Sequence, residues 1–173
     1  MTLRLLQTLW QSMSLCSQAN KNHEQEIKER VLDQFAACMQ KELQAFSLFK
    51  GSSDYFFDTE KVWEDSSTVA GVNLYVIFTP EFNGRDQFTI EIGWSRLRRF
   101  PQLVRRPSLS FSSEFTLCSD AQEATARLPK IMSLELDSWV EVNKDNVEEV
   151  VSTQFKNLMA YGMPFLKKNC LPQ

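Results

Sequence analysis

The sequence predicts an α+β fold, an antiparallel β-sheet meander with a long N-terminal helix and a C-terminal helix packed on one face. Apolar residues recur at helical spacing over residues 24–49, alternate with polar residues in several later segments, and return to helical spacing near the C-terminus. At 173 residues the chain is long enough to bury a continuous core. We therefore expect one domain over residues 1–173, with residues 1–20 either packed on it or forming an N-terminal helical arm.

The N-terminal region contains the clearest helical pattern. Polar residues interrupt residues 3–16, so an amphipathic helix or an adherent arm is expected there rather than a signal peptide. Residues 24–49 follow spacings of three and four, with Asn22 as the expected N-cap and Gly51 as the stop. The apolar positions of this helix are Ile27, Val31, Phe35, Met39, Leu43 and Phe46.

The middle of the chain has the two-residue period of strands. Aromatic runs in residues 54–64 favour one or two strands. Residues 72–79 and 88–94 alternate apolar and polar side chains on either side of a turn, which predicts a hairpin with one buried face. Residues 109–117 repeat the alternation and predict another strand of the same sheet.

The last third returns to helical patterns. Residues 120–128 favour a short helix that Pro129 ends, and residues 132–136 favour a strand, with a helix as the alternative. A helical stripe runs over residues 147–161. Gly162 is the expected end of this helix, because the proline two residues later prevents its continuation.

Several reaction chemistries lack their residues in this chain. The single histidine, His23, lies in a polar stretch and is expected at the surface, so no Ser–His–Asp or Cys–His arrangement is supported. No glycine-rich phosphate loop occurs. The four cysteines are far apart without a CxxC pair, which favours reduced thiols in a cytoplasmic protein. We expect no cofactor and no metal.

Two acidic groups were candidates for chemistry. Asp86 and Glu91 lie on the predicted hairpin, as the carboxylates of metal-dependent nucleases do, but no lysine follows Glu91 at the required place. Its position in the alternation predicts an ordinary outward-facing residue. Glu60, Glu64 and Asp65 form the second group, for which we expect a solvated strand end or a contact surface for a basic partner.

One stretch concentrates positive charge in a chain whose net charge is −3. Residues 96–106 contain five arginines and no acid, and Pro101 with its apolar neighbours predicts a loop. Arginine forms bidentate bonds with phosphates and carboxylates. These arginines either pair with the protein's own acids or bind an anion or an acidic surface. The candidate binding residues are Arg96, Arg98, Arg99, Phe100, Arg105 and Arg106.

The C-terminal third resembles the bacterial domain of unknown function 4304 family. The resemblance is carried by Trp139-Val140-Glu141-Val142, a following helix, the tail Tyr161-Gly162-Met163-Pro164-Phe165-Leu166, and a strand of the Phe88–Trp94 kind. It covers roughly residues 24–168 and leaves out the arginine stretch and residues 1–20. The resemblance implies the α+β fold and a bacterial cytoplasmic setting, without an established activity or site residue.

These observations leave three functional hypotheses open. The preferred one is a non-enzymatic bacterial interaction protein of the immunity or antitoxin type that binds a protein partner. The second is a nucleic-acid- or anion-binding module that uses the stretch from Arg96 to Arg106. The third is an enzyme whose site is assembled from scattered acids and arginines. No apolar run approaches the roughly 18 residues of a membrane span, so no membrane role is expected.

Overall fold

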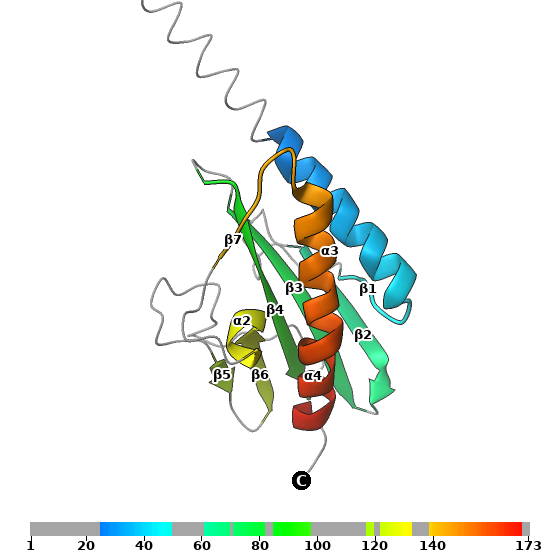
Figure 1. The fold of residues 1–173 in the computed structure, drawn as a ribbon. Coiled ribbons are helices and arrows are strands. Elements are labelled where there is room, and N and C mark those ends of the chain that lie inside the picture. The colour runs from blue at the N-terminus through cyan, green and yellow to red at the C-terminus, as the bar shows by residue number, and fades with distance from the viewer. Residues whose placement is uncertain are drawn as a thin grey trace, which may run out of the picture.

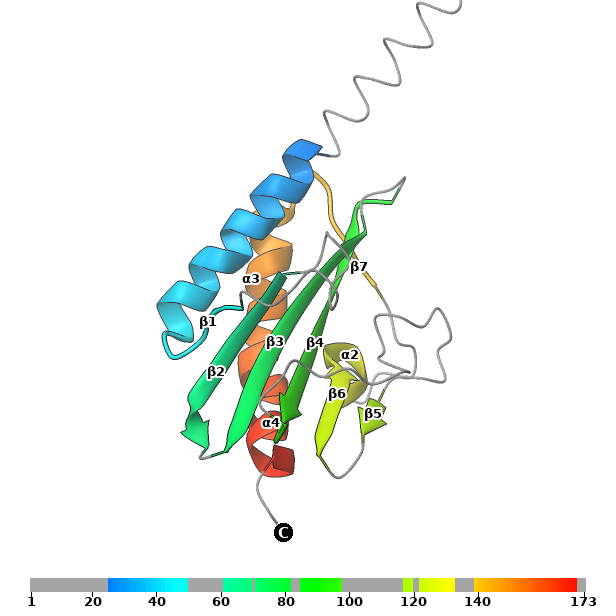
Figure 2. The ribbon, with the colours of Figure 1, turned by 180° about the vertical axis from the view of Figure 1, so that it is seen from behind.

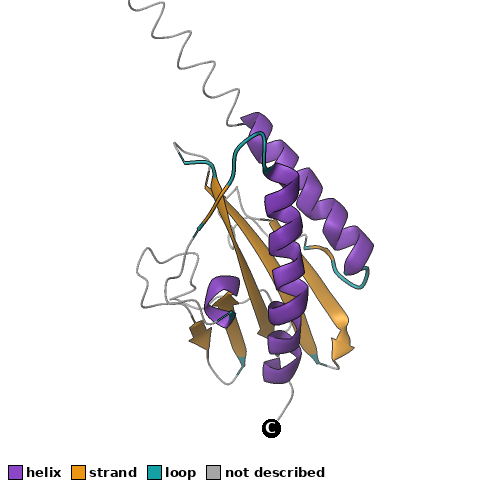
Figure 3. Cartoon of the chain, in the orientation of Figure 1, coloured by secondary structure: helices purple, strands orange, loops and turns teal. Residues whose placement is uncertain are grey.

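The computed structural model describes residues 25–49, 61–69, 71–81, 85–97, 117–119, 122–132 and 139–170. Within these residues, a seven-stranded antiparallel sheet lies against a layer of helices (Figure 1). Seen from behind in Figure 2, the long strands lie in front of the helices, and the colouring of Figure 3 shows the same two layers. The predicted α+β class, with an N-terminal and a C-terminal helix on one face, is confirmed.

The sheet is built around three long strands that follow one another in the chain. Its members are β1 (Ser47–Leu48), β2 (Lys61–Val69), β3 (Val72–Glu81), β4 (Gln87–Ser95), β5 (Leu117–Ser119), β6 (Glu123–Arg127) and β7 (Val140–Glu141). The predicted hairpin is present as β3 and β4, and β2 precedes it in a meander. Gly71, with a φ of 76°, lies in the turn between β2 and β3, where its missing Cβ avoids strain.

The far edge of the sheet departs from simple chain order. The strand order is β1-β2-β3-β4-β6-β5, so β6 rather than β5 pairs with β4. β6 pairs with residues 91–95 of β4, while β7 pairs with its first two residues, Gln87 and Phe88. One edge of β4 therefore holds two strands that are separate in sequence.

β6 is a strand where the sequence predicts a helix. The short helix expected over residues 120–128 is wrong, because residues 123–127 pair with β4. Alanine favours a helix locally, but here the two alanines of β6 face the helix layer, and the three polar residues that alternate with them face the other side of the sheet. The helix α2 (Leu128–Ile131) begins only after the strand. Pro129 lies in its first turn, where a missing N–H removes no helical hydrogen bond.

The N-terminal helix (residues 25–42) packs on the sheet through the predicted stripe. Ile27, Val31, Phe35 and Met39 are all buried. The helix ends earlier than the predicted residue 49. Phe46 continues the apolar spacing and is buried, but it reaches the core from a turn that leads into β1.

The C-terminal helix continues past its predicted end. α3 (Val147–Asn157) leads into a π-helical turn, η3 (Leu158–Gly162), and then into α4 (Met163–Cys170). The wide turn is marked by the hydrogen bond that the Met163 N–H donates to the Leu158 carbonyl, five residues earlier. Proline disturbs a regular helix by pressing on the carbonyl four residues earlier. For Pro164 that carbonyl belongs to Ala160, inside the wide turn, so the helix continues.

An aromatic cluster joins the helix layer to the sheet. The ring of Phe35 lies 5.3 Å from that of Trp63 on β2, 5.0 Å from that of Phe78 on β3 and 5.8 Å from that of Phe155 on α3, measured between centroids. Tilted and edge-on contacts at these distances suit aromatic pairs. The core therefore lies between the two helices and the β2–β4 meander.

Some predicted features lie outside the described residues. They include residues 1–24 with the predicted arm, the N-cap at Asn22 and His23, and also residues 54–60, 98–116 and 133–138. Among the helices that the structure describes, none has the length and apolar character required to cross a bilayer.

Candidate functional site

The arginine stretch is described only at its beginning. The Arg96 guanidinium lies 4.6 Å from the ring centroid of Trp94, and its backbone N–H donates a 2.7 Å hydrogen bond to the Gln122 carbonyl. Arg96 is thus held against the end of β4 and is only half-buried. The other candidates, Arg98, Arg99, Phe100, Arg105 and Arg106, lie outside the described residues. The proposal that this stretch binds an anion or nucleic acid stays a prediction.

The face of the sheet that points away from the helices is buried and largely polar, apart from an apolar cluster of Val62, Tyr75 and Ile77. The predicted hairpin had one buried face, whereas the structure buries both. Across β3, β4 and β6, the pairing places Ile77, Glu91 and Arg127 in one row and Tyr75, Gly93 and Thr125 in the next. The six residues are nearly inaccessible to solvent. Glu91, expected to face outward in solvent, faces away from the helices as predicted but is 0% exposed.

A buried ion pair lies at the centre of this polar face. The Nε atom of Arg127 lies 3.9 Å from Oε1 of Glu91, and the Arg127 side chain is only 4% exposed. The Arg127 guanidinium also lies 5.4 Å from the ring centroid of Trp139, within the range of a cation–π contact. Removing the two charges from water costs several kcal/mol per ion. Each charge therefore depends on the other, because the loss of one partner would leave an uncompensated charge in the protein interior.

The second predicted acidic group divides between the two faces of β2. Asp65 is buried and accepts hydrogen bonds from the backbone N–H and the hydroxyl of Ser67. Glu64 accepts a 3.2 Å hydrogen bond from the Tyr75 hydroxyl. Burial raises the pKa of Glu64, and it raises the pKa of Tyr75 far above its usual range. Glu64 and Asp65 are therefore parts of the fold and do not form a solvated strand end, while Glu60 lies outside the described residues.

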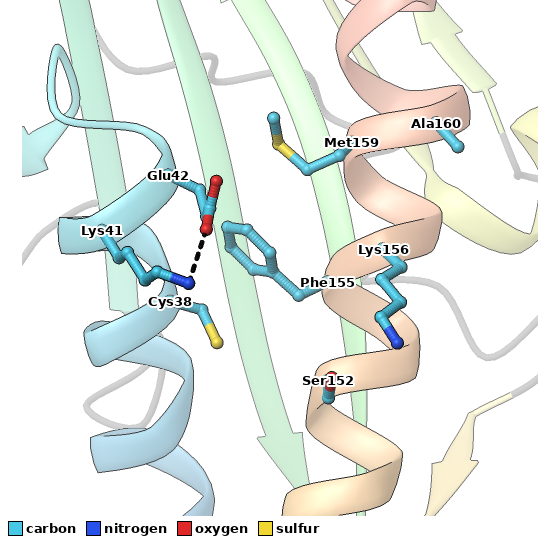
Figure 4. A pocket seen from close by; sticks show the side chains of 8 residues that line it. All are labelled: Cys38, Lys41, Glu42, Ser152, Phe155, Lys156, Met159 and Ala160. Carbon is cyan, nitrogen blue, oxygen red and sulfur yellow. Dashed lines mark ion pairs between the residues drawn. The ribbon is translucent and has the colours of Figure 1, made fainter.

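A groove open to solvent lies on the helix layer. We call it the helix-pair groove, because the N-terminal helix and α3 form its two walls (Figure 4). Its volume is about 560 Å³. The N-terminal helix contributes Cys38, Lys41 and Glu42, and the α3–η3 helix contributes Ser152, Phe155, Lys156, Met159 and Ala160.

The local sequence explains why this groove is open. Both walls are built from positions three and four residues apart, which share one face of a helix. Small side chains at Cys38, Ser152 and Ala160 leave space where larger ones would close the gap. Phe155 is nearly buried, whereas Met159 remains 37% exposed. The groove thus combines an apolar interior with an accessible apolar side chain.

Charged side chains border the groove on both walls. The Lys41 ammonium lies 3.0 Å from the Glu42 carboxylate on the N-terminal helix. That interaction is the main reason why the pKa of Lys41 is raised. Lys156 projects from the opposite wall and is exposed (Figure 4). Two cations and one anion therefore surround the apolar interior.

The groove contains no activated nucleophile. Burial raises the pKa of the Cys38 thiol, so this thiol stays protonated near neutral pH, and the thiolate is the reactive form. No histidine occurs among the described residues. Within the same residues, no three His, Cys, Asp or Glu side chains are placed to share a metal ion.

The groove has no signature in the sequence of either helix alone. Its walls are separated by more than a hundred residues, and each wall taken alone is an ordinary amphipathic helix. The available signal was the set of small or charged residues beside each stripe, at Cys38 and Lys41 and again at Ser152 and Lys156. That signal has meaning only once the two helices are known to be neighbours.

Comparison with known proteins does not add a relative. No protein-family model, no curated protein and no solved structure matches this chain. The resemblance to the domain of unknown function 4304 family stays a prediction.

Proposed function

We propose that this chain is a non-enzymatic interaction protein that binds a partner protein through the helix-pair groove. The observation that supports the proposal most is the exposure of Met159 above the apolar side chain of Phe155. A single exposed apolar residue is ordinary on a protein surface. Met159, however, lies in a concave surface with charges at its rim, which is the arrangement of an interface anchor and its polar border.

The chemistry of the groove supports binding over catalysis. The Cys38 thiol in the groove has a raised pKa, and the buried Glu91–Arg127 pair lies on the opposite face of the sheet. Methionine adapts its shape easily, which suits a side chain that must fit a partner. The proposal extends to a bacterial, cytoplasmic protein of the immunity or antitoxin type. The family resemblance and the widely spaced cysteines support that setting.

The proposal is tested by placing a charge in the groove. The full chain is tagged and used to capture partners from a lysate of its source organism, as wild type and as Met159→Glu. Leu48→Glu is the matched control, because Leu48 is also an exposed apolar residue but lies on β1 outside the groove. We expect the wild type and Leu48→Glu to retain a stoichiometric partner protein and Met159→Glu to retain at least about tenfold less, a loss of roughly 1.4 kcal/mol in binding.

A second measurement locates the contact. A partner in the groove should slow the alkylation of Cys38 by iodoacetamide, as followed by peptide mass spectrometry, in the wild-type complex. The proposal is wrong if no stoichiometric partner is captured, or if Met159→Glu retains it as well as the wild type does.

A further inference from the structure

The shape of the helix-pair groove indicates the kind of segment that fits it. Its walls are the side-chain faces of two helices that run side by side in the same direction (Figures 1 and 2). The backbone groups of helix interiors are already hydrogen-bonded to one another. A segment that docks here therefore receives side-chain contacts but no ladder of backbone hydrogen bonds.

This lack of backbone hydrogen-bond partners favours a helical segment over an extended peptide. An extended peptide would bury N–H and C=O groups against apolar walls, and each unsatisfied group costs about 1–3 kcal/mol. An α-helix satisfies these groups internally and presents only side chains, as in known helix-in-groove complexes. Residues 152–160 of one wall extend over roughly 12 Å at 1.5 Å per residue, enough for about two turns of a docked helix.

The charges around the groove indicate which polar residues a docked helix would carry. Lys41 and Lys156 lie on opposite walls, and Glu42 lies beside Lys41. Lys167 and Lys168 follow in the last turn of α4. The exposed acids of α3, Glu148 and Glu149, lie in its first turn, away from the groove-lining positions. At the groove end of the helix layer, cationic side chains therefore outnumber anionic ones, with Lys41, Lys156, Lys167 and Lys168 against Glu42.

We propose that the partner segment bound in the helix-pair groove is an acidic amphipathic helix. Its apolar residues, at spacings of three and four, occupy the space beside Cys38, Phe155 and Met159. Its carboxylates, on both flanks, lie opposite Lys41 and Lys156. This inference rests on the proposed function and adds the chemistry of the partner.

Defined peptides test the inference with the full chain. The first probe is a fluorescently labelled, hydrocarbon-stapled 14-residue helix with leucines on one face and glutamates on both flanks. The second has lysines in place of the glutamates, and the third has serines in place of the leucines. We expect the Glu-flanked helix to bind with a micromolar Kd in fluorescence anisotropy. We expect at least tenfold weaker binding for the other two, and a weakening with added salt.

Variants of the protein assign the binding to the groove. Lys156→Glu should weaken the Glu-flanked helix at least fivefold and favour the Lys-flanked one, and Met159→Glu should weaken both. The matched controls are Lys144→Glu, an exposed lysine in the turn before α3, and Leu48→Glu. Both controls should bind the Glu-flanked helix as the wild type does.

The outcomes separate this inference from the proposed function. Equal or stronger binding of the Lys-flanked helix, no binding of the Glu-flanked helix, or no effect of Lys156→Glu would overturn the inference. In each of these cases a partner lost in Met159→Glu capture would leave the proposed function standing. Retention of the partner by Met159→Glu would overturn the proposed function itself.

Discussion

At the scale of single residues, Glu91 separates what sequence can and cannot predict. The alternation of β4 correctly directs its side chain away from the helix layer, because successive side chains of a strand point to opposite faces. The same alternation suggested exposure to solvent, and Glu91 is buried beside Arg127. Direction is a local property of the strand. Burial depends on which other segments of the chain cover that face. It therefore cannot be predicted from the sequence of the strand alone.

The Glu91–Arg127 pair yields a prediction about stability. Arg127→Met removes the cation beside a buried carboxylate and should lower the free energy of unfolding by about 3–5 kcal/mol. Glu91→Leu combined with Arg127→Met should lose less than the sum of the two single variants, with a coupling of about 0.5–3 kcal/mol. Urea denaturation of the four proteins measures this cycle. Additive losses would mean that the two side chains do not interact.

At the scale of elements, periodicity predicted helix faces well and helix ends poorly. The stripe of the N-terminal helix and the β3–β4 hairpin were read correctly, because both patterns are set by local geometry. The end at Gly162 was wrong, although glycine followed by proline is a common stop signal. Gly162 instead lies inside a continuous helix, packed between Leu158 and Leu128. The close approach of the Leu158 and Leu128 side chains is the reason for a glycine here.

Gly162→Ala tests this explanation. A Cβ at this position would lie 2.9 Å from Leu158 Cδ1 and 3.3 Å from Leu128 Cδ1, and both leucines are buried. Overpacking lowers the free energy of unfolding by about 1–3 kcal/mol. The higher helix propensity of alanine offsets up to about 1 kcal/mol of this loss. We expect a net loss of about 1 kcal/mol in urea denaturation. A gain in stability, as at an open helical position, would refute the packing role.

At the scale of the whole molecule, the contact between the helix layer and the sheet is the main structural feature. Phe35 lies at its centre and touches aromatic residues from β2, β3 and α3. The helix-pair groove is a consequence of the same packing, because the aromatic cluster sets the two helices beside each other on the sheet. The groove and the stability of the fold are therefore connected through this cluster.

Phe35→Ala should be among the most damaging substitutions in the described residues. Removing a fully buried aromatic ring leaves a cavity and costs about 3–5 kcal/mol. Phe35→Leu, which retains part of the volume, should cost clearly less. Thermal and urea unfolding of both variants, followed by circular dichroism, measure the difference. Similar, small losses for both would mean that the cluster contributes little to holding the layers together.

The sequence by itself determined the fold class, the apolar faces of the N-terminal helix and of β3 and β4, and the presence of a single histidine, because these follow from periodicity and composition. Only the tertiary structure decided that residues 123–127 form a strand, that the polar face carrying Glu91 is buried, and that two distant helices form a groove. Each of these depends on which segments become neighbours. Pairing and packing between elements far apart in the chain decide which segments become neighbours. Local sequence patterns therefore do not predict it.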